Sequence, residues 1–222
     1  MKTAVVLLSG GLDSSTVLFY AKRKGYDCHC LIFDYGQRHK KELRSAVKLA
    51  RLSKSPYQIL KINFPWKAGS LLDRQSKIPV FYPSEASAKE GRLPSTYVPG
   101  RNTIFISFAL SYAEAIKAGT VFIGANAVDY SGYPDCRPGY YKAFNKVLTA
   151  LGTGVKIQTP LIDLTKEAII KLGMKLGVPY EFTWSCYKGG SKPCCVCDSC
   201  RFRAKGFIKA RSVDPALHSL NK

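Results

Sequence analysis

The sequence predicts an α/β fold, in which a Rossmann-like parallel sheet carries helices on both faces. Short apolar runs rich in β-branched residues alternate along the chain with segments of helical periodicity. Strands separated by helices of this length pair in parallel through right-handed crossovers. The 222 residues match the size of one large domain, and 46% of them are hydrophobic, which suffices for a core without disulfides. We therefore expect residues 1–222 to form a single domain.

Five strands and five helices are expected in turn. In the first part of the chain, the apolar runs predict strands at residues 4–8, 28–33 and 57–62, and the periodic segments predict helices at residues 13–24 and 38–52. In the second part, the same rules predict helices at residues 102–118, 140–151 and 166–176, and strands at residues 121–125 and 156–159.

Residues 63–96 show no sustained periodicity and contain four prolines: Pro65, Pro79, Pro83 and Pro94. Loops of more than about 12–15 residues are uncommon in compact domains and are often functional. We expect a lid-like loop here that covers a site, with a surface excursion of no function as the alternative.

The chain is strongly basic, with 34 Lys and Arg residues against 15 Asp and Glu residues, a formal charge of +19. This balance indicates an anionic partner, either a nucleotide, a nucleic acid or a membrane surface. Four basic residues fall on one helical face, where a solvated surface and a binding stripe both remain open: Lys40, Arg44, Lys48 and Arg51. No apolar run reaches the roughly 18–20 residues of a membrane span, and the N-terminus does not resemble a signal peptide. We expect a cytoplasmic protein that does not bind membranes.

The segment SGGLDSST, residues 9–16, lies between the first strand and the first helix. Gly10 and Gly11 let the backbone approach an anion closely, and free N–H groups at the helix N-terminus supply donors. Three serines add hydroxyl donors, but the Lys of a GxxxxGK[ST] phosphate loop is absent. The segment predicts phosphate binding of another kind. The alternative is a glycine-rich turn in which Asp13 caps the helix.

Four of the eight cysteines follow a metal-binding pattern, in which C-x2-C-x2-C is preceded by a fourth thiol: Cys186, Cys194, Cys197 and Cys200. Four thiolates suit a tetrahedral Zn²⁺ ion that is closed and structural. An Fe–S cluster and metal-free thiols are the alternatives, although the continuation seen in bacterial ferredoxins is missing. We expect a small C-terminal zinc knuckle over residues 186–200, with Cys195 as a spare thiol.

Two further loops are rich in groups that recognise ligands. The segment NAVDYSGYPDCRP, residues 126–138, can stack a planar ring on Tyr130 or Tyr133 and accept hydrogen bonds on Asp129 or Asp135. The segment FDYGQRH, residues 33–39, ends the second strand, and open α/β sheets bind ligands outside the carboxyl ends of their strands. His39 has a surface histidine as its alternative interpretation.

The glycine-rich segment resembles the PP-loop of ATP pyrophosphatases, where SGGxDS holds ATP for adenylation. Six motifs in one order resemble the 7-cyano-7-deazaguanine synthase (QueC) family: SGGLDSS, FDYGQRH, VPGRN, DYSGYPDCRP, TPLIDLTKE and TWSCY. The resemblance runs from about Val5 to Arg203. Two residues depart from the pattern, because Cys195 stands where a Gly is expected and Gly139 where an acidic residue is usual.

The resemblance implies an adenine nucleotide alpha hydrolase-like fold and a ligase that converts 7-carboxy-7-deazaguanine, ammonia and ATP into the nitrile 7-cyano-7-deazaguanine. It also implies a homodimer and Mg²⁺ bound with ATP. The implied ATP contacts are Leu8, Ser9, Gly10, Gly11, Leu12, Asp13, Ser14, Ser15, Thr16, Val17 and Leu18. The implied catalytic residues are Asp13, as the Mg²⁺ ligand, with Arg38, His39, Arg101 and Lys166. The implied substrate contacts are Tyr35, Asn126, Asp129, Tyr130 and Asp135.

Two rival functions remain open on the sequence. A PP-loop tRNA-modifying enzyme, such as a thiolase or a lysidine-type ligase, is favoured by the basic surface. Direct tRNA binding is nevertheless not favoured, because no appended RNA-binding domain is evident in the sequence. The other rival is a nucleotide-binding module without catalysis, and an intact SGGLDSS segment argues against it.

Overall fold

The computed structural model describes residues 2–66, 69–73, 75, 78, 93, 95–128 and 133–218. Its centre is a sheet of five parallel strands in the order β3-β2-β1-β4-β5. The strands are β1 (Lys2–Leu7), β2 (Tyr26–Asp34), β3 (Tyr57–Lys61), β4 (Thr120–Phe122) and β5 (Lys156–Gln158). The predicted parallel α/β fold is confirmed. Because the strand order reverses on either side of β1, the carboxyl ends of β1 and β4 frame the crevice where such sheets bind ligands.

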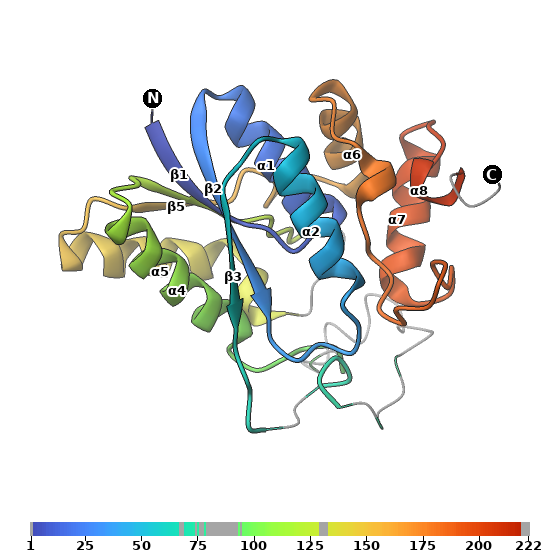
Figure 1. Ribbon diagram of the computed structural model, residues 1–222, viewed down its shortest axis with the longest axis horizontal. Coiled ribbons are helices and arrows are strands. Elements are labelled where there is room, and N and C mark those ends of the chain that lie inside the picture. The colour runs from blue at the N-terminus through green and yellow to red at the C-terminus, as the bar shows by residue number, and fades with distance from the viewer. Residues whose placement is uncertain are drawn as a thin grey trace.

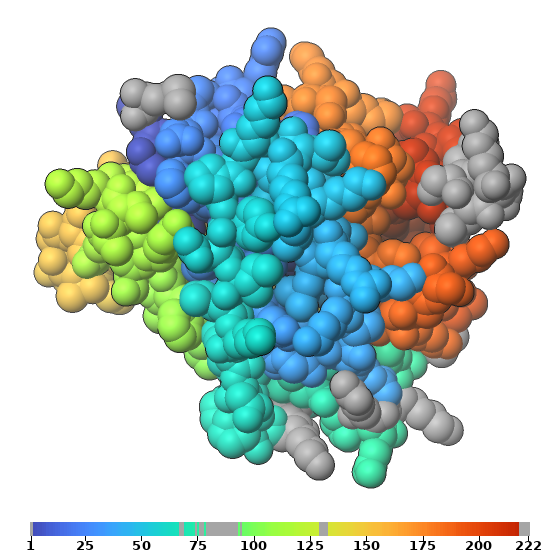
Figure 2. All heavy atoms as spheres, viewed as in Figure 1, coloured from blue at the N-terminus to red at the C-terminus, as the bar shows by residue number. Residues whose placement is uncertain are grey.

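Helices cover both faces of the sheet (Figure 1). One face carries α1 (Leu12–Arg23), α2 (Lys41–Leu52), α6 (Lys166–Lys175) and α7 (Asp198–Lys209), and the other carries α4 (Arg101–Ala115) and α5 (Pro138–Leu151). The described residues also form shorter helices, namely η1 (Pro134–Cys136), η2 (Tyr180–Phe182) and α8 (Pro215–His218). In Figure 2, the blue and cyan first part of the chain lies between the green and yellow α4–α5 side and the orange and red C-terminal side.

Alternating residues of the central strands supply two cores. Along β1, Ala4 and Val6 face the cluster beneath α1, α2, α6 and α7, whereas Val5 faces the cluster beneath α4 and α5. All three are fully buried, as expected for a parallel strand covered on both sides. Both cores converge on β1, so the segment that leaves β1 starts from a strand that is buried on both faces.

One predicted helix starts at a different residue in the structure, and one helix was not predicted. The helix expected from residue 38 begins at Lys41, because the Gln37 side chain bonds the backbone of Tyr35 and Phe33 and holds a turn there. Helix α7 was not predicted, since its start is part of the cysteine-rich segment. Its Arg203 is buried and donates to Asp214 through Nε at 2.6 Å and Nη2 at 2.8 Å.

Three predictions lie wholly or mostly outside the described residues. Asp129 and Tyr130 belong to the undescribed residues 129–132, and the lid-like loop of residues 63–96 is described only in part. None of the helices in the described ranges combines the length and apolar content that a membrane span requires.

Candidate active site

The glycine-rich loop of residues 9–16 connects β1 to α1 and has a backbone that only glycine can adopt at its centre. Gly10 has a φ of +81°, and a Cβ atom there would lie 2.4 Å from the carbonyl oxygen of Glu42 and 2.6 Å from the amide of Ala46. Gly124, after β4, approaches so closely that its Cβ would lie 2.8 Å from the amide of Ser14. These glycines bring α2 and the β4 end against the start of α1, so the N-terminus of α1 opens into the crevice.

Hydroxyl groups of this loop brace its own backbone. Ser9 Oγ and Ser14 Oγ lie 3.0 Å apart, and Ser15 Oγ donates to the carbonyl of Gly11 at 2.6 Å. Thr16 Oγ1 donates to Leu12 at 2.9 Å. The predicted ATP contacts lie in two kinds of place. Several of them line the cavity described below: Leu8, Ser9, Gly11, Leu12, Asp13 and Ser14. Val17 and Leu18 have side chains fully buried in the core, where they position α1.

Asp13 and Lys166 form a bidentate ion pair at the N-terminus of α1. Lys166 Nζ lies 2.8 Å from Oδ1 and 2.7 Å from Oδ2 of Asp13, and both side chains are largely shielded from solvent. Lys166 is the first residue of α6, which the Thr165 side chain caps by accepting from the Ala168 amide at 3.2 Å. The pair places one cation and one carboxylate beside the glycine-rich loop, a composition that suits a metal-bound polyphosphate.

A cavity of about 380 Å³ extends from this loop towards α4 and α2. That volume is within the usual range of small-molecule sites. All five predicted catalytic residues line it: Asp13, Arg38, His39, Arg101 and Lys166. Arg101 is held at the start of α4, where its Nη1 donates to the Tyr35 hydroxyl at 3.2 Å and its guanidinium carbon lies 5.5 Å from the ring centroid. The cavity therefore has one end at the glycine-rich loop, with the Asp13–Lys166 pair, and a second end with the cationic Arg101.

Glu42 is a cavity residue that the sequence did not reveal. It lies in the first turn of α2, and burial raises the pKa of its carboxyl group to about 7, although the nearby Arg101 opposes this. Glu42 is one of twelve residues in an amphipathic helix, and no sequence signal distinguishes it from an ordinary exposed acid. His39 stands beside it in the lining; burial lowers the pKa of its imidazole, and its Nδ1 has no hydrogen-bond partner within the described residues.

The predicted substrate contacts occupy different places. Tyr35 and Asn126 line the cavity, and the Asn126 side-chain amide donates to the carbonyls of Leu161, at 3.1 Å, and Leu164. Asp135 is buried outside the cavity lining, where the backbone and side chain of Asn102 hydrogen-bond its carboxylate. Asp135 thus contacts the start of α4, whereas Tyr133 and Cys136 of the same loop line the cavity as Asn126 does.

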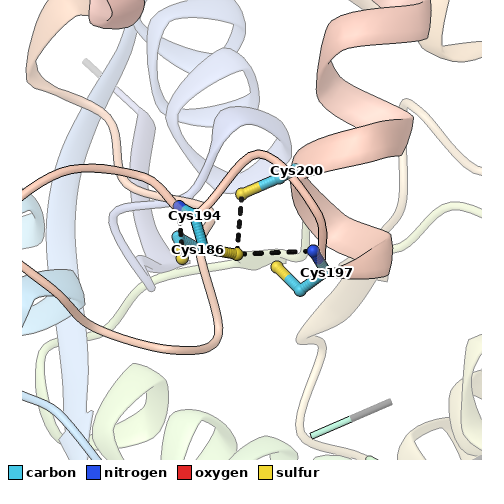
Figure 3. A group of neighbouring side chains, drawn as sticks. All are labelled: Cys186, Cys194, Cys197 and Cys200. Carbon is cyan, nitrogen blue, oxygen red and sulfur yellow. Dashed lines mark hydrogen bonds between the residues drawn. The ribbon is translucent and has the colours of Figure 1, made fainter. Parts of the chain in front are cut away.

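The four patterned cysteines gather just before and at the start of α7 (Figure 3). Their sulfur atoms all lie within 4.8 Å of one another, and Cys194 Sγ is 4.0 Å from Cys200 Sγ. Tetrahedral Zn–S bonds of about 2.3 Å would put sulfurs about 3.8 Å apart, so the cluster has dimensions that suit such an ion. Backbone amides of Cys194 and Cys197 donate to Cys186 Sγ and Cys194 Sγ, each at 3.3 Å, as expected around thiolates.

The cysteine segment also forms one wall of the cavity. Trp184, Ser185 and Tyr187 line it, and the Trp184 amide donates to the Gly10 carbonyl at 2.9 Å. From α2, Lys41 Nζ donates to the Ser191 carbonyl at 2.6 Å and lies 4.3 Å from the Trp184 ring centroid. The metal-type cluster and the glycine-rich loop are therefore tied together, and the shape of one depends on the other.

The sequence that forms this loop, cavity and cysteine cluster matches the model of a known family. The model of the queuosine biosynthesis protein QueC matches residues 3–211. The chain belongs to the QueC family. Two curated proteins named 7-cyano-7-deazaguanine synthase are close relatives. The one from Thermoplasma acidophilum is 52% identical, covering 96% of this chain and 91% of its own. The one from Nostoc punctiforme is 49% identical, covering 97% and 99%.

Among solved structures, an NMN synthetase from Francisella tularensis is similar with a TM-score of 0.50 and 18% sequence identity, covering 99% of this chain and 82% of its own. This likeness shows the fold alone.

Proposed function

We propose that this QueC-family chain uses ATP to convert 7-carboxy-7-deazaguanine and ammonia into 7-cyano-7-deazaguanine, for queuosine or archaeosine biosynthesis. The observation that carries the proposal is one cavity whose two ends have different chemistry. The glycine-rich loop and the N-terminus of α1 supply a phosphate site, and Arg101 with Arg38 supplies cations for a carboxylate. Identity of about half over nearly the whole length of two synthase relatives supports the same activity.

The chemistry explains why one cavity must hold ATP and an acid together. A carboxylate is a poor electrophile, so one of its oxygens attacks the α-phosphorus of ATP and pyrophosphate leaves. Ammonia then attacks the acyl carbon and AMP leaves, which gives an amide. The amide oxygen attacks the α-phosphorus of a second ATP and a second pyrophosphate leaves. Loss of AMP and of the two N–H protons then forms the nitrile. Each step requires positioning and charge neutralisation more than covalent participation of the protein.

The residues have separate proposed roles. Backbone groups of Ser9 and Gly11 hold the phosphates, and Lys166 neutralises the leaving pyrophosphate while it orients Asp13. With nucleotide bound, Asp13 would hold Mg²⁺, which supplies further charge neutralisation. Arg101 holds the substrate carboxylate, and Tyr35 packs against the deazaguanine ring. Asp129 and Tyr130, at the undescribed tip of the 126–138 loop, stay proposals as ring contacts, and His39 as a proton carrier.

We further propose that the four cysteines hold a structural Zn²⁺ ion. The sulfur spacing fits tetrahedral Zn–S geometry, and all four positions of the ion would be filled by protein thiolates. The ion would then stabilise the segment that supplies Trp184 and Tyr187 to the cavity wall. Free thiols throughout the described chain fit a cytoplasmic location. A homodimer and a single domain over residues 1–222 remain proposals, and tRNA binding is not proposed.

A direct assay tests the proposed function. Purified protein is incubated with 7-carboxy-7-deazaguanine, ammonium and Mg-ATP, and the nitrile, the amide and AMP are quantified by mass spectrometry. We expect two AMP for each nitrile and an amide that forms first and is then consumed. Nitrile formed with one AMP and no amide would overturn the mechanism. Absence of acid-dependent ATP–pyrophosphate exchange would leave a binding module, and steeply salt-dependent RNA affinity would point to the tRNA-modifying alternative.

A further inference from the structure

Glu42 is a carboxylate in the cavity with no assigned partner. Two carboxylates line the described part of the cavity, Asp13 and Glu42. Asp13 is ion-paired with Lys166, whereas the Glu42 side chain makes no hydrogen bond or ion pair with the described residues. Glu42 is only partly buried, so its carboxyl group can exchange protons with solvent or with a ligand in the cavity. A function at the reacting atoms explains why it is there.

The backbone places Glu42 between the two ends of the cavity. Its carbonyl oxygen lies against Gly10 so tightly that a Cβ on that glycine would be 2.4 Å away. Glu42 lies close enough to Arg101 of α4, to Tyr35 after β2 and to Tyr187 of the cysteine segment for their charges to influence one another. Because the acyl carbon must meet the α-phosphate of ATP, the reacting centre lies where the loop and the Arg101 end join. Glu42 stands at that junction.

The proposed chemistry needs a base at that junction. Ammonia is present mainly as ammonium at neutral pH, so one proton must leave before nitrogen can attack. After attack, the tetrahedral adduct R–C(O⁻)(NH₃⁺)(OAMP) must lose another proton as AMP departs. In the second half, the O-adenylated amide R–C(=NH₂⁺)(OAMP) loses two protons and AMP to give R–C≡N. All of these protons leave nitrogen bonded, or about to be bonded, to the same carbon.

We infer that Glu42 is the general base that takes protons from this nitrogen in both halves of the reaction. The inference rests on the proposed function. When the carboxylate takes a proton from ammonium, the freed electron pair on nitrogen forms the C–N bond. When it takes a proton from the tetrahedral adduct, the adduct collapses to the amide and the C–O bond to AMP breaks. In the second half, it takes the two N–H protons in turn, and their electron pairs complete the C≡N bond as the second C–O bond to AMP breaks. Glu42 then returns its proton to solvent before the next step.

The electrostatic surroundings suit this role. Burial raises the pKa of Glu42 to about 7, and Arg101 keeps it from rising further. The other facing groups stay neutral at that pH, because burial raises the pKa of both the Tyr35 and the Tyr187 hydroxyl. The cationic Arg38 and the neutral His39 lie on the near side, just before α2. A base that titrates close to the working pH combines an adequate basic fraction with adequate basicity.

The test compares Glu42→Gln with Glu114→Gln, a control on the exposed side of α4. We expect both variants to keep acid-dependent ATP–pyrophosphate exchange, since adenylation releases no N–H proton. Amide formation from ammonia should fall by about 10²–10⁴-fold in Glu42→Gln only. Nitrile formation from supplied amide should fall by a similar factor. Hydroxylamine is a weaker base than ammonia and is largely neutral, so its conversion to the hydroxamate should fall by less than about tenfold.

Three further outcomes decide the matter. Glu42→Asp should restore part of the ammonia reaction, and Glu42→Gln should lose the rise in rate that the parent shows as pH increases through 7. Equal loss with ammonia and hydroxylamine, together with a raised KM for the acid, would overturn the inference and make Glu42 a contact to the ring. Loss of exchange in both Glu42 variants would also overturn it. If the parent itself shows no acid-dependent exchange, the proposed function has failed instead.

Discussion

The substitution Gly10→Ala tests whether the glycine-rich loop is the foundation of the site. Gly10 has a φ of +81°, and an added Cβ would lie 2.4 Å from the Glu42 carbonyl oxygen and 2.6 Å from the Ala46 amide. Both neighbours are helix backbone, which cannot move aside as a flexible side chain can. Gly25 offers a matched control, because it has the same φ of +81° and no atom within 4 Å of an added Cβ.

The two variants separate backbone strain from steric overlap. A non-glycine residue with left-handed backbone costs about 1–2 kcal/mol, and both variants carry that cost. Gly10→Ala adds overpacking against α2, typically about 1–3 kcal/mol. For a chain of this size each kcal/mol lowers Tm by roughly 2–4 °C. We therefore expect Tm to fall by roughly 2–8 °C in Gly25→Ala and by roughly 4–20 °C in Gly10→Ala.

Activity provides the sharper readout. The overlap at Gly10 displaces the loop from α2, so ATP–pyrophosphate exchange should fall by at least about tenfold at a temperature where the variant is still folded. Gly25→Ala should exchange at the parent rate, because the turn after α1 lies outside the cavity lining. Equal Tm values for the two variants, with full exchange by Gly10→Ala, would refute the argument from close approach.

Three other predictions concern separate contacts. Lys166→Met should lower the rate of ATP–pyrophosphate exchange by roughly 100-fold. Lys171→Met, which removes an exposed ion pair with Glu167 on the same helix, should leave that rate unchanged. Equal effects of the two substitutions would contradict a phosphate role for Lys166. Cys194→Ser should lose bound zinc by elemental analysis and exchange activity with it, whereas Cys195→Ser, at an exposed thiol, should keep about one zinc per chain. Asp214→Ala should lower the free energy of unfolding by about 3–5 kcal/mol in denaturant titration, since it leaves buried Arg203 unpaired; a loss below ~1 kcal/mol would contradict this.

The order of strands and helices could be predicted because each element has a local signal. Apolar runs such as the one around Val5 are buried on both faces, and the helix that follows the glycine-rich loop starts within one residue of the expected position. The cluster of four cysteines could likewise be predicted from their spacing, because residues close in sequence can come together without contacts between distant segments. Helix α7 was not predicted, because its first turn belongs to that cluster and was interpreted only as part of a metal site.

The functional cavity was less predictable because it depends on contacts between distant segments. Asp13 and Lys166 were each expected in the site, but their pairing over 153 positions follows only from the packing of α6 beside α1. Asp135 was expected, as an alternative to Asp129, to accept from the substrate ring; its position outside the described cavity lining and beside Asn102 follows only from the packing of this loop on α4. No local sequence pattern distinguishes Glu42, because its proposed role depends on Arg101, whose helix covers the opposite face of the sheet.

The hydrogen bond from the Trp184 amide to the Gly10 carbonyl, 2.9 Å long, has a consequence for protein synthesis. The first strand and its loop leave the ribosome early, but the residue that completes the loop follows 174 positions later (184 − 10). At ~5–20 residues per second, that interval is roughly 9–35 s. A nascent chain therefore cannot form this contact, which joins the glycine-rich loop to the cysteine segment, until Trp184 has been translated.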